Sequence, residues 1–124
     1  MSDPVAAVVG LLDEHLDVPV YGATFQGEPP GVLVRAVGGG ALAIGYMPTV
    51  DARLDVLTYG ESDWHAAQVD RDAARFLHAL RYQTTAHGSV HWCRLEGGPT
   101  QARDTQTGWP TVLSSWQVYG DWLG

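Results

Sequence analysis

The segment RLDVLTYGESDWHAAQVDRDAARFLHAL, residues 53 to 80, decides the fold of this chain. Its first part alternates apolar and polar residues up to Tyr59 and Gly60, which is typical of a strand with one buried face. From about Ser62 to Tyr82 the apolar residues recur every three or four positions, which predicts a helix. Many α/β enzymes place their chemistry at such a joint, so it has to be weighed both as a site and as a structural element.

The neighbouring segments predict the remaining elements. Ser2, Asp3 and Pro4 form a helix start, because a capping side chain precedes a proline whose missing N–H costs nothing there. A helix with an apolar stripe follows, and Pro19 ends it. Apolar runs bounded by turn residues predict strands at 18–25, 31–37, 53–59, 89–96 and 110–120. The order α-β-β-β-α-β-β predicts a single α+β domain over residues 1–124, with helices packed on a mixed or antiparallel sheet.

Composition limits the function classes. A hydrophobic content of 45% with 17% charged residues is ordinary for a folded globular protein. No apolar run reaches the roughly 18 residues of a membrane span, and the basic start of a signal peptide is missing. A single cysteine, Cys93, permits no internal disulfide, so we expect synthesis in a reducing cytosol. A net charge of −7 argues against a protein that grips nucleic acid by its phosphates.

Three residues with ligand-capable side chains, His87, His91 and Cys93, lie close together in the sequence. On a strand they share one face, but positions 87 and 93 are about 20 Å apart, whereas zinc holds its donors at about 2.0–2.3 Å. We therefore favour a strand with a partly buried thiol beside a histidine. A metal site or a small enzyme that uses these residues remains the alternative.

Two patterns resemble parts of enzyme motifs, but the residues around them do not fit those motifs. Gly38, Gly40 and Ala43 match part of a dinucleotide-binding pattern. That pattern needs a helix N-terminus facing the phosphates, and Pro48 allows barely two turns of helix. The serine pair at 114–115 lacks the sharp turn and the spaced histidine of a nucleophilic serine. We therefore expect no enzymatic activity, no cofactor and no bound metal.

The second predicted helix carries a stripe of basic residues, Arg71, Arg75 and His78, that could contact phosphate. Asp70 and Asp72 stand beside the stripe and make a mixed-charge surface, which argues against nucleic-acid binding. Arg71 and Arg75 remain candidates for ion pairs with acids of a neighbouring subunit.

Apolar residues at exposed-looking positions suggest an interface. Trp109 in a predicted loop and Trp122 in the tail are hard to bury within one small domain, and the connection 38–51 is unusually apolar. A partner could cover these side chains, or they could fold back onto their own sheet. The candidate interface residues are Leu42, Ile44, Tyr46, Met47, Trp109 and Trp122, together with the arginines above.

Segments 53–80 and 103–120 also carry a resemblance to a known family. The first runs from an alternating strand through Tyr59-Gly60 into a long helix with small residues, and the second combines D-x-x-T-G-x-P with a strand that ends in Val-Tyr-Gly. In these features the chain resembles the small tail terminator, or tail completion, proteins of long-tailed bacteriophages, the lambda-type terminators and their relatives. The element order covers almost the whole chain.

The resemblance implies a structural virion protein without catalytic residues, assembled in the host cytoplasm. Members of the family form a hexameric ring on the head-proximal end of the tail tube. The ring stops polymerisation of the tube and offers a surface to the neck proteins, and DNA passes through it without specific binding. The expected partners are further copies of this chain, the tail tube protein and a head-completion protein, with no membrane. A head-completion or neck connector protein is the alternative within virion proteins.

Overall fold

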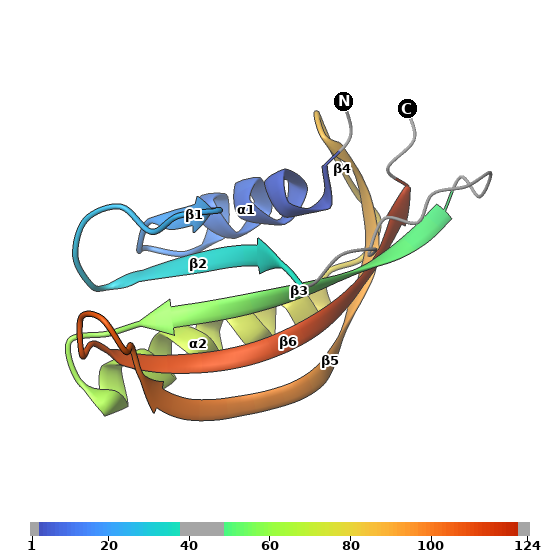
Figure 1. Ribbon diagram of the computed structural model, residues 1–124. Coiled ribbons are helices and arrows are strands. Elements are labelled where there is room, and N and C mark those ends of the chain that lie inside the picture. The colour runs from blue at the N-terminus through green and yellow to red at the C-terminus, as the bar shows by residue number, and fades with distance from the viewer. Residues whose placement is uncertain (1–2, 38–48, 122–124) are drawn as a thin grey trace.

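The computed structural model describes residues 3–37 and 49–121. The elements in these ranges are α1 (Pro4–His15), β1 (Val20–Gly22), β2 (Gly31–Ala36), β3 (Thr49–Tyr59), α2 (Asp63–Ala79), β4 (Gln83–Thr85), β5 (Gly88–Arg103) and β6 (Pro110–Asp121). The strands form one mixed sheet in the order β1-β2-β3-β6-β5-β4 (Figure 1). The predicted single α+β domain is therefore confirmed, with the short strand β4 as an addition to the expected order.

Both helices lie on the same face of the sheet (Figure 1). β1 pairs with β2 in parallel, and all other neighbours are antiparallel. The sheet curls around the helical layer, because α1 contacts β1 and β2 at one side and β5 at the other. A hydrogen bond of 2.9 Å from the Asp3 N–H to the His87 carbonyl ties the start of α1 to the turn before β5.

Capping residues set where the helices begin. The Asp3 carboxylate accepts hydrogen bonds from the N–H groups of Val5 and Ala6, at 2.9 and 3.3 Å. Ser62 caps α2, since its Oγ accepts from the His65 N–H at 3.0 Å. Each cap satisfies backbone donors that have no partner inside the helix, so the predicted helix starts are confirmed.

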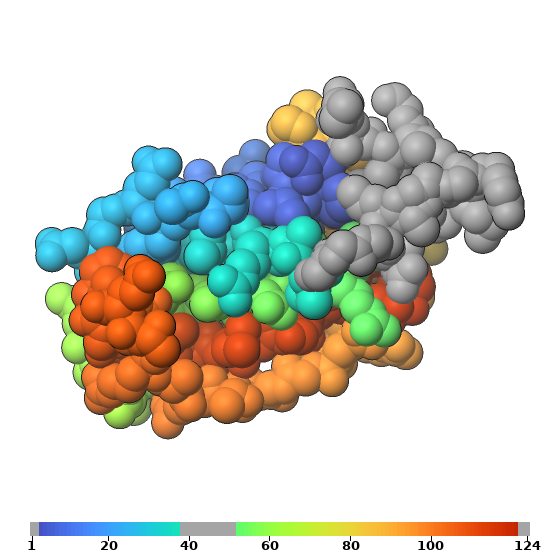
Figure 2. All heavy atoms as spheres, viewed as in Figure 1, coloured from blue at the N-terminus to red at the C-terminus, as the bar shows by residue number. Residues whose placement is uncertain are grey.

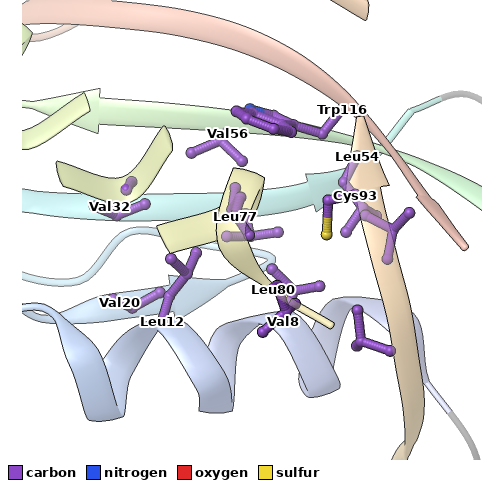
Figure 3. Close-up of a cluster of buried hydrophobic side chains, with 14 of the residues drawn as sticks. Val8, Leu12, Val20, Val32, Leu54, Val56, Leu77, Leu80, Cys93 and Trp116 are labelled. Atoms are coloured by element: carbon purple, nitrogen blue, oxygen red, sulfur yellow. The ribbon is translucent and has the colours of Figure 1, made fainter. Parts of the chain in front are cut away.

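The hydrophobic core fills the space between the helices and the inner face of the sheet (Figure 3). Leu12 from α1, Leu77 from α2 and Trp116 from β6 are among its largest fully buried side chains. The inner positions of β3 alternate with outward residues, as the segment 53–59 predicts. Burial of these apolar side chains is the main stabilising contribution to such a fold.

The joint between β3 and α2 depends on a close approach of two backbones. A Cβ added to Gly60 would lie 2.7 Å from the Cα of Ala66 in the first turn of α2. The Thr58 hydroxyl, which is buried, lies 3.3 Å from the carbonyl oxygens of both Ala66 and Val112. The helix start is thereby held against β3 and β6, which makes the joint a packing element of the domain.

The strand predicted at 89–96 is too short. β5 continues to Arg103 and remains paired with β6 through register shifts on either side of Gly97. Glycine and Pro99 at this place produce bulges in the strand, where the sequence pattern had suggested a turn. The turn itself is short and runs from Asp104 to Trp109, joined by a backbone hydrogen bond of 3.0 Å.

The edge of β5 that faces away from β6 is largely unpaired. β4 covers it only at Gly88–Val90. Along the remainder, up to Arg103, no other strand of the described residues lies beside it. Pro99 has no N–H to offer on this edge, and the bulges interrupt its regular spacing.

Candidate functional site

The predicted interface residues fall into three groups. Arg71 and Arg75 are exposed on α2, and neither takes part in the ion pairs found within residues 3–37 and 49–121. Both are therefore accessible to a partner. Trp109 lies in the turn before β6 and is half-buried. The other candidates lie outside the described residues, and they are Leu42, Ile44, Tyr46, Met47 and Trp122.

Trp109 packs on its own domain. It belongs to an aromatic cluster with Phe25 and Tyr59, whose ring centroids lie 5.7 Å from that of Trp109 in both cases. Figure 2 shows the two segments that supply Phe25 and Trp109 side by side at one end of the sheet.

The turn before Trp109 is held by Asp104. Its carboxylate accepts hydrogen bonds from the N–H groups of Thr107 and Gln106, each at 2.9 Å, and these bonds hold the pKa of Asp104 below its ordinary value.

Arginines and acids alternate on the outer face of the sheet, which neither helix covers. The Arg53 Nε lies 3.3 Å from Glu96, and Arg94 lies 3.7 Å from the same carboxylate. The Ser115 hydroxyl donates to Asp55 at 2.8 Å. Exposed ion pairs of this kind contribute at most about 1 kcal/mol each, so they shape this surface more than they stabilise it.

The structure separates the three ligand-capable residues His87, His91 and Cys93. Cys93 is buried in the core, and burial raises the pKa of its thiol to about 12. His91 lies at a bulge of β5 with its ring 5.2 Å from that of Tyr82, and His87 is exposed. In the described part of the chain, no group of three His, Cys, Asp or Glu side chains is placed to hold a metal ion.

The most site-like cluster is one that the sequence pattern missed. Asp70, expected on a mixed-charge surface, is only 6% exposed, so this expectation was wrong. Its carboxyl is hydrogen-bonded to the side chain of Ser114 on β6. Ser114 also accepts a hydrogen bond of 2.9 Å from the indole N–H of Trp116. A buried polar chain therefore joins α2 to the inner face of the sheet.

A cavity of about 400 Å³ opens beside this chain, between the flank of α2 and the strands β5 and β6. Asp70 and Ser114 lie in its lining, and most of the remaining lining is apolar, including Ala74 and Leu95. Burial raises the pKa of Asp70 above its ordinary value, and the hydrogen bond with Ser114 opposes this shift.

The geometry of the cluster suits binding better than nucleophilic catalysis. The His78 ring packs on Trp116, with centroids 4.9 Å apart. No hydrogen bond in residues 3–37 and 49–121 joins His78 to Ser114, so the contact between a serine and a histidine base is missing. Ser115 points to the opposite face of the sheet, where it meets Asp55.

A signal for this cluster was present in the sequence. Asp70 follows Ala66 by four residues and precedes Ala73 by three, so it belongs to the buried stripe of α2. Ser114 alternates with Val112 and Trp116, which places it on the inner face of β6. A polar residue among apolar neighbours on one face of a helix or strand indicates a buried polar group, and both Asp70 and Ser114 show this pattern.

Comparison with known proteins does not assign this cluster. Among protein-family models and curated protein sequences, none matches the chain. Within the described residues, no helix is long and apolar enough to cross a membrane.

Proposed function

We propose that the protein is a ring-forming tail terminator of a long-tailed bacteriophage. It caps the head-proximal end of the tail tube, stops polymerisation of the tube and provides the surface for head-tail joining. One observation carries the proposal. The two segments that resemble the family meet in space, where the Gly60 N–H donates to the Pro110 carbonyl at 3.1 Å.

The same junction contains further contacts between the two segments. Arg103, at the end of β5, forms an ion pair of 3.3 Å with Asp63 in the first turn of α2. Tyr59 and Trp109 pack edge to face. The segments that resemble the family thus form one structural unit, which supports a structural role for them.

Charge and exposed surface are compatible with a ring through which DNA passes. A protein with net charge −7 repels phosphate and does not retain the passing genome. A closed ring of identical subunits needs two different complementary patches on each subunit. The apolar loop 41–47 is our hypothesis for one of these patches, and the exposed Arg71 and Arg75, which could pair with acids of a neighbouring subunit, are the second candidate.

Native mass measurement with negative-stain imaging tests the proposal. Six copies of a 13.4 kDa chain give a ring of about 80 kDa, either in solution or after addition of tail tubes. One capped end on each tube supports the terminator role. A protein that ignores tubes and binds filled heads is a neck connector, and one that binds neither is no virion component of this kind.

The substitutions Ile44→Asp and Met47→Asp together test the interface hypothesis. We expect the double variant to fold and to fail in assembly, because two carboxylates would enter an apolar contact. The matched control is Thr24→Asp with Gln26→Asp, which adds the same charge at exposed positions. Normal assembly of the first variant would refute the assignment of this segment.

A further inference from the structure

Asp70 is a buried acidic residue without a cation beside it. It is 6% exposed, and no ion pair in residues 3–37 and 49–121 includes it. Charged side chains in protein interiors are almost always paired, because the uncompensated charge is costly there. Ser114 supplies only a neutral hydrogen bond, so burial disfavours the ionised form of this carboxyl, and a cation beside it would stabilise that form.

The cavity beside α2 gives a ligand access to this carboxyl. Its volume of about 400 Å³ lies in the range of small-molecule sites. The lining combines apolar side chains, such as Ala74 and Leu95, with a few polar groups around Asp70. Mostly apolar walls with convergent polar groups are the usual composition of a binding pocket.

The burial of Asp70, rather than the sum of the charges in the lining, favours a cation inside the cavity. Arg71 also borders the cavity, but its side chain is exposed and water screens its charge. The buried Asp70 acts through a low-dielectric interior, where the same charge has a larger effect on a ligand. The ring of Trp116 forms another part of the lining, and the face of an indole attracts cations.

We propose that this cavity binds an organic cation, a primary ammonium group on an apolar stem. The ammonium group pairs with Asp70, and the stem lies against Ala74 and Leu95. A free amine and the lysine side chain of a partner polypeptide share this chemistry. The site is independent of the ring proposed above and would remain if that proposal failed.

The first experiment is a titration with hexylammonium chloride, followed by ¹H–¹⁵N NMR. The indole N–H of Trp116 is the reporter, because it donates to Ser114, the hydrogen-bond partner of Asp70. We expect saturable shifts with hexylammonium and an affinity for hexanol, the neutral control, at least tenfold weaker. Equal affinities, or no saturable shift at about 10 mM, would overturn the proposal.

Two variants separate the contribution of the Asp70 charge to binding from the contribution of the cavity volume. Asp70→Asn keeps the shape and an acceptor for Ser114, and it should lower the affinity for hexylammonium to that for hexanol. Asp72→Asn, exposed on the same helix, is the matched control and should change nothing. Ala74→Leu fills part of the cavity and should lower the affinity for both probes. This variant keeps the test decisive if Asp70→Asn folds poorly.

The peptide acetyl-Ala-Lys-Ala-amide distinguishes the two sources of the cation. Tighter binding of this peptide than of hexylammonium, lost when the lysine is acetylated, assigns the site to a partner polypeptide. Tighter binding of the free amine assigns it to a small molecule. Absence of binding by both probes would contradict the cation site altogether.

Discussion

The indole N–H of Trp116 donates a hydrogen bond of 2.9 Å to the Oγ of Ser114, two residues earlier on the same face of β6. Both side chains are almost completely buried. Since Ser114 is also hydrogen-bonded to Asp70 on α2, a single hydroxyl connects a helix, a strand and the largest side chain of the core.

We expect Ser114→Ala to destabilise the domain by about 1–3 kcal/mol, because a buried indole donor loses its acceptor and Asp70 loses its donor. Urea unfolding measures the change. The neighbouring Ser115→Ala is the control, and it should cost under about 1 kcal/mol because its bond to Asp55 lies on the partly exposed outer face. Equal losses of unfolding free energy in the two variants would show that the buried hydrogen bonds of Ser114 stabilise the domain no more than the exposed bond of Ser115.

The stability of the wild type should depend on the ionisation of Asp70. Its pKa is raised in the folded state, so the folded protein holds this proton at pH values where the unfolded chain has lost it. The free energy of unfolding should therefore fall as pH rises from the ordinary pKa of 3.8 through the raised value. The Asp70→Asn variant should lack this decrease, because it has no carboxyl to titrate at this position. If the unfolding free energies of the two proteins changed with pH in parallel, the burial of an ionisable carboxyl would be contradicted.

Gly60→Ala should destabilise the domain by about 1–3 kcal/mol or more, because its Cβ would collide with the backbone of Ala66 at the start of α2. Gly10→Ala provides the opposite control. A Cβ at Gly10 meets nothing within 4 Å, and alanine in the middle of α1 should stabilise the helix by about 0.5–1 kcal/mol. Thermal unfolding of both variants should show a lowered melting temperature for Gly60→Ala and a raised one for Gly10→Ala.

The thiol of Cys93 should be unreactive in the folded protein. Its pKa of about 12 keeps it protonated at neutral pH, and it is buried in the core. Ellman's reagent should react only as the domain opens, and rapidly in denaturing urea. Thr84→Cys in a Cys93→Ala background supplies an exposed thiol for comparison, and equal rates in the folded state would refute the burial.

Local patterns predicted most of the fold. Asp3 and Ser62 act as helix caps because their side chains satisfy backbone donors nearby, which depends only on adjacent residues. Alternation along 53–59 identified β3 because a strand with one buried face has this period. These signals do not require knowledge of distant parts of the chain.

The features that were missed depend on distant contacts. The short strand Gln83–Thr85 is polar and exposed, and it exists because β5 offers it an edge. Gly97 and Pro99 resemble a turn locally, but pairing with β6 keeps the chain extended there. The cluster of Asp70 and Ser114 depends on how α2 and β6 are placed relative to each other, whereas the sequence shows only that Asp70 lies on a buried stripe of its helix.

The long, irregular edge of β5 has a consequence for how this protein meets its neighbours. A straight edge would accept the backbone of any extended chain, since backbone hydrogen bonds carry no sequence information. The bulges and Pro99 interrupt that generic template. This edge is therefore a poor template for unspecific strand pairing, which disfavours aggregation through it.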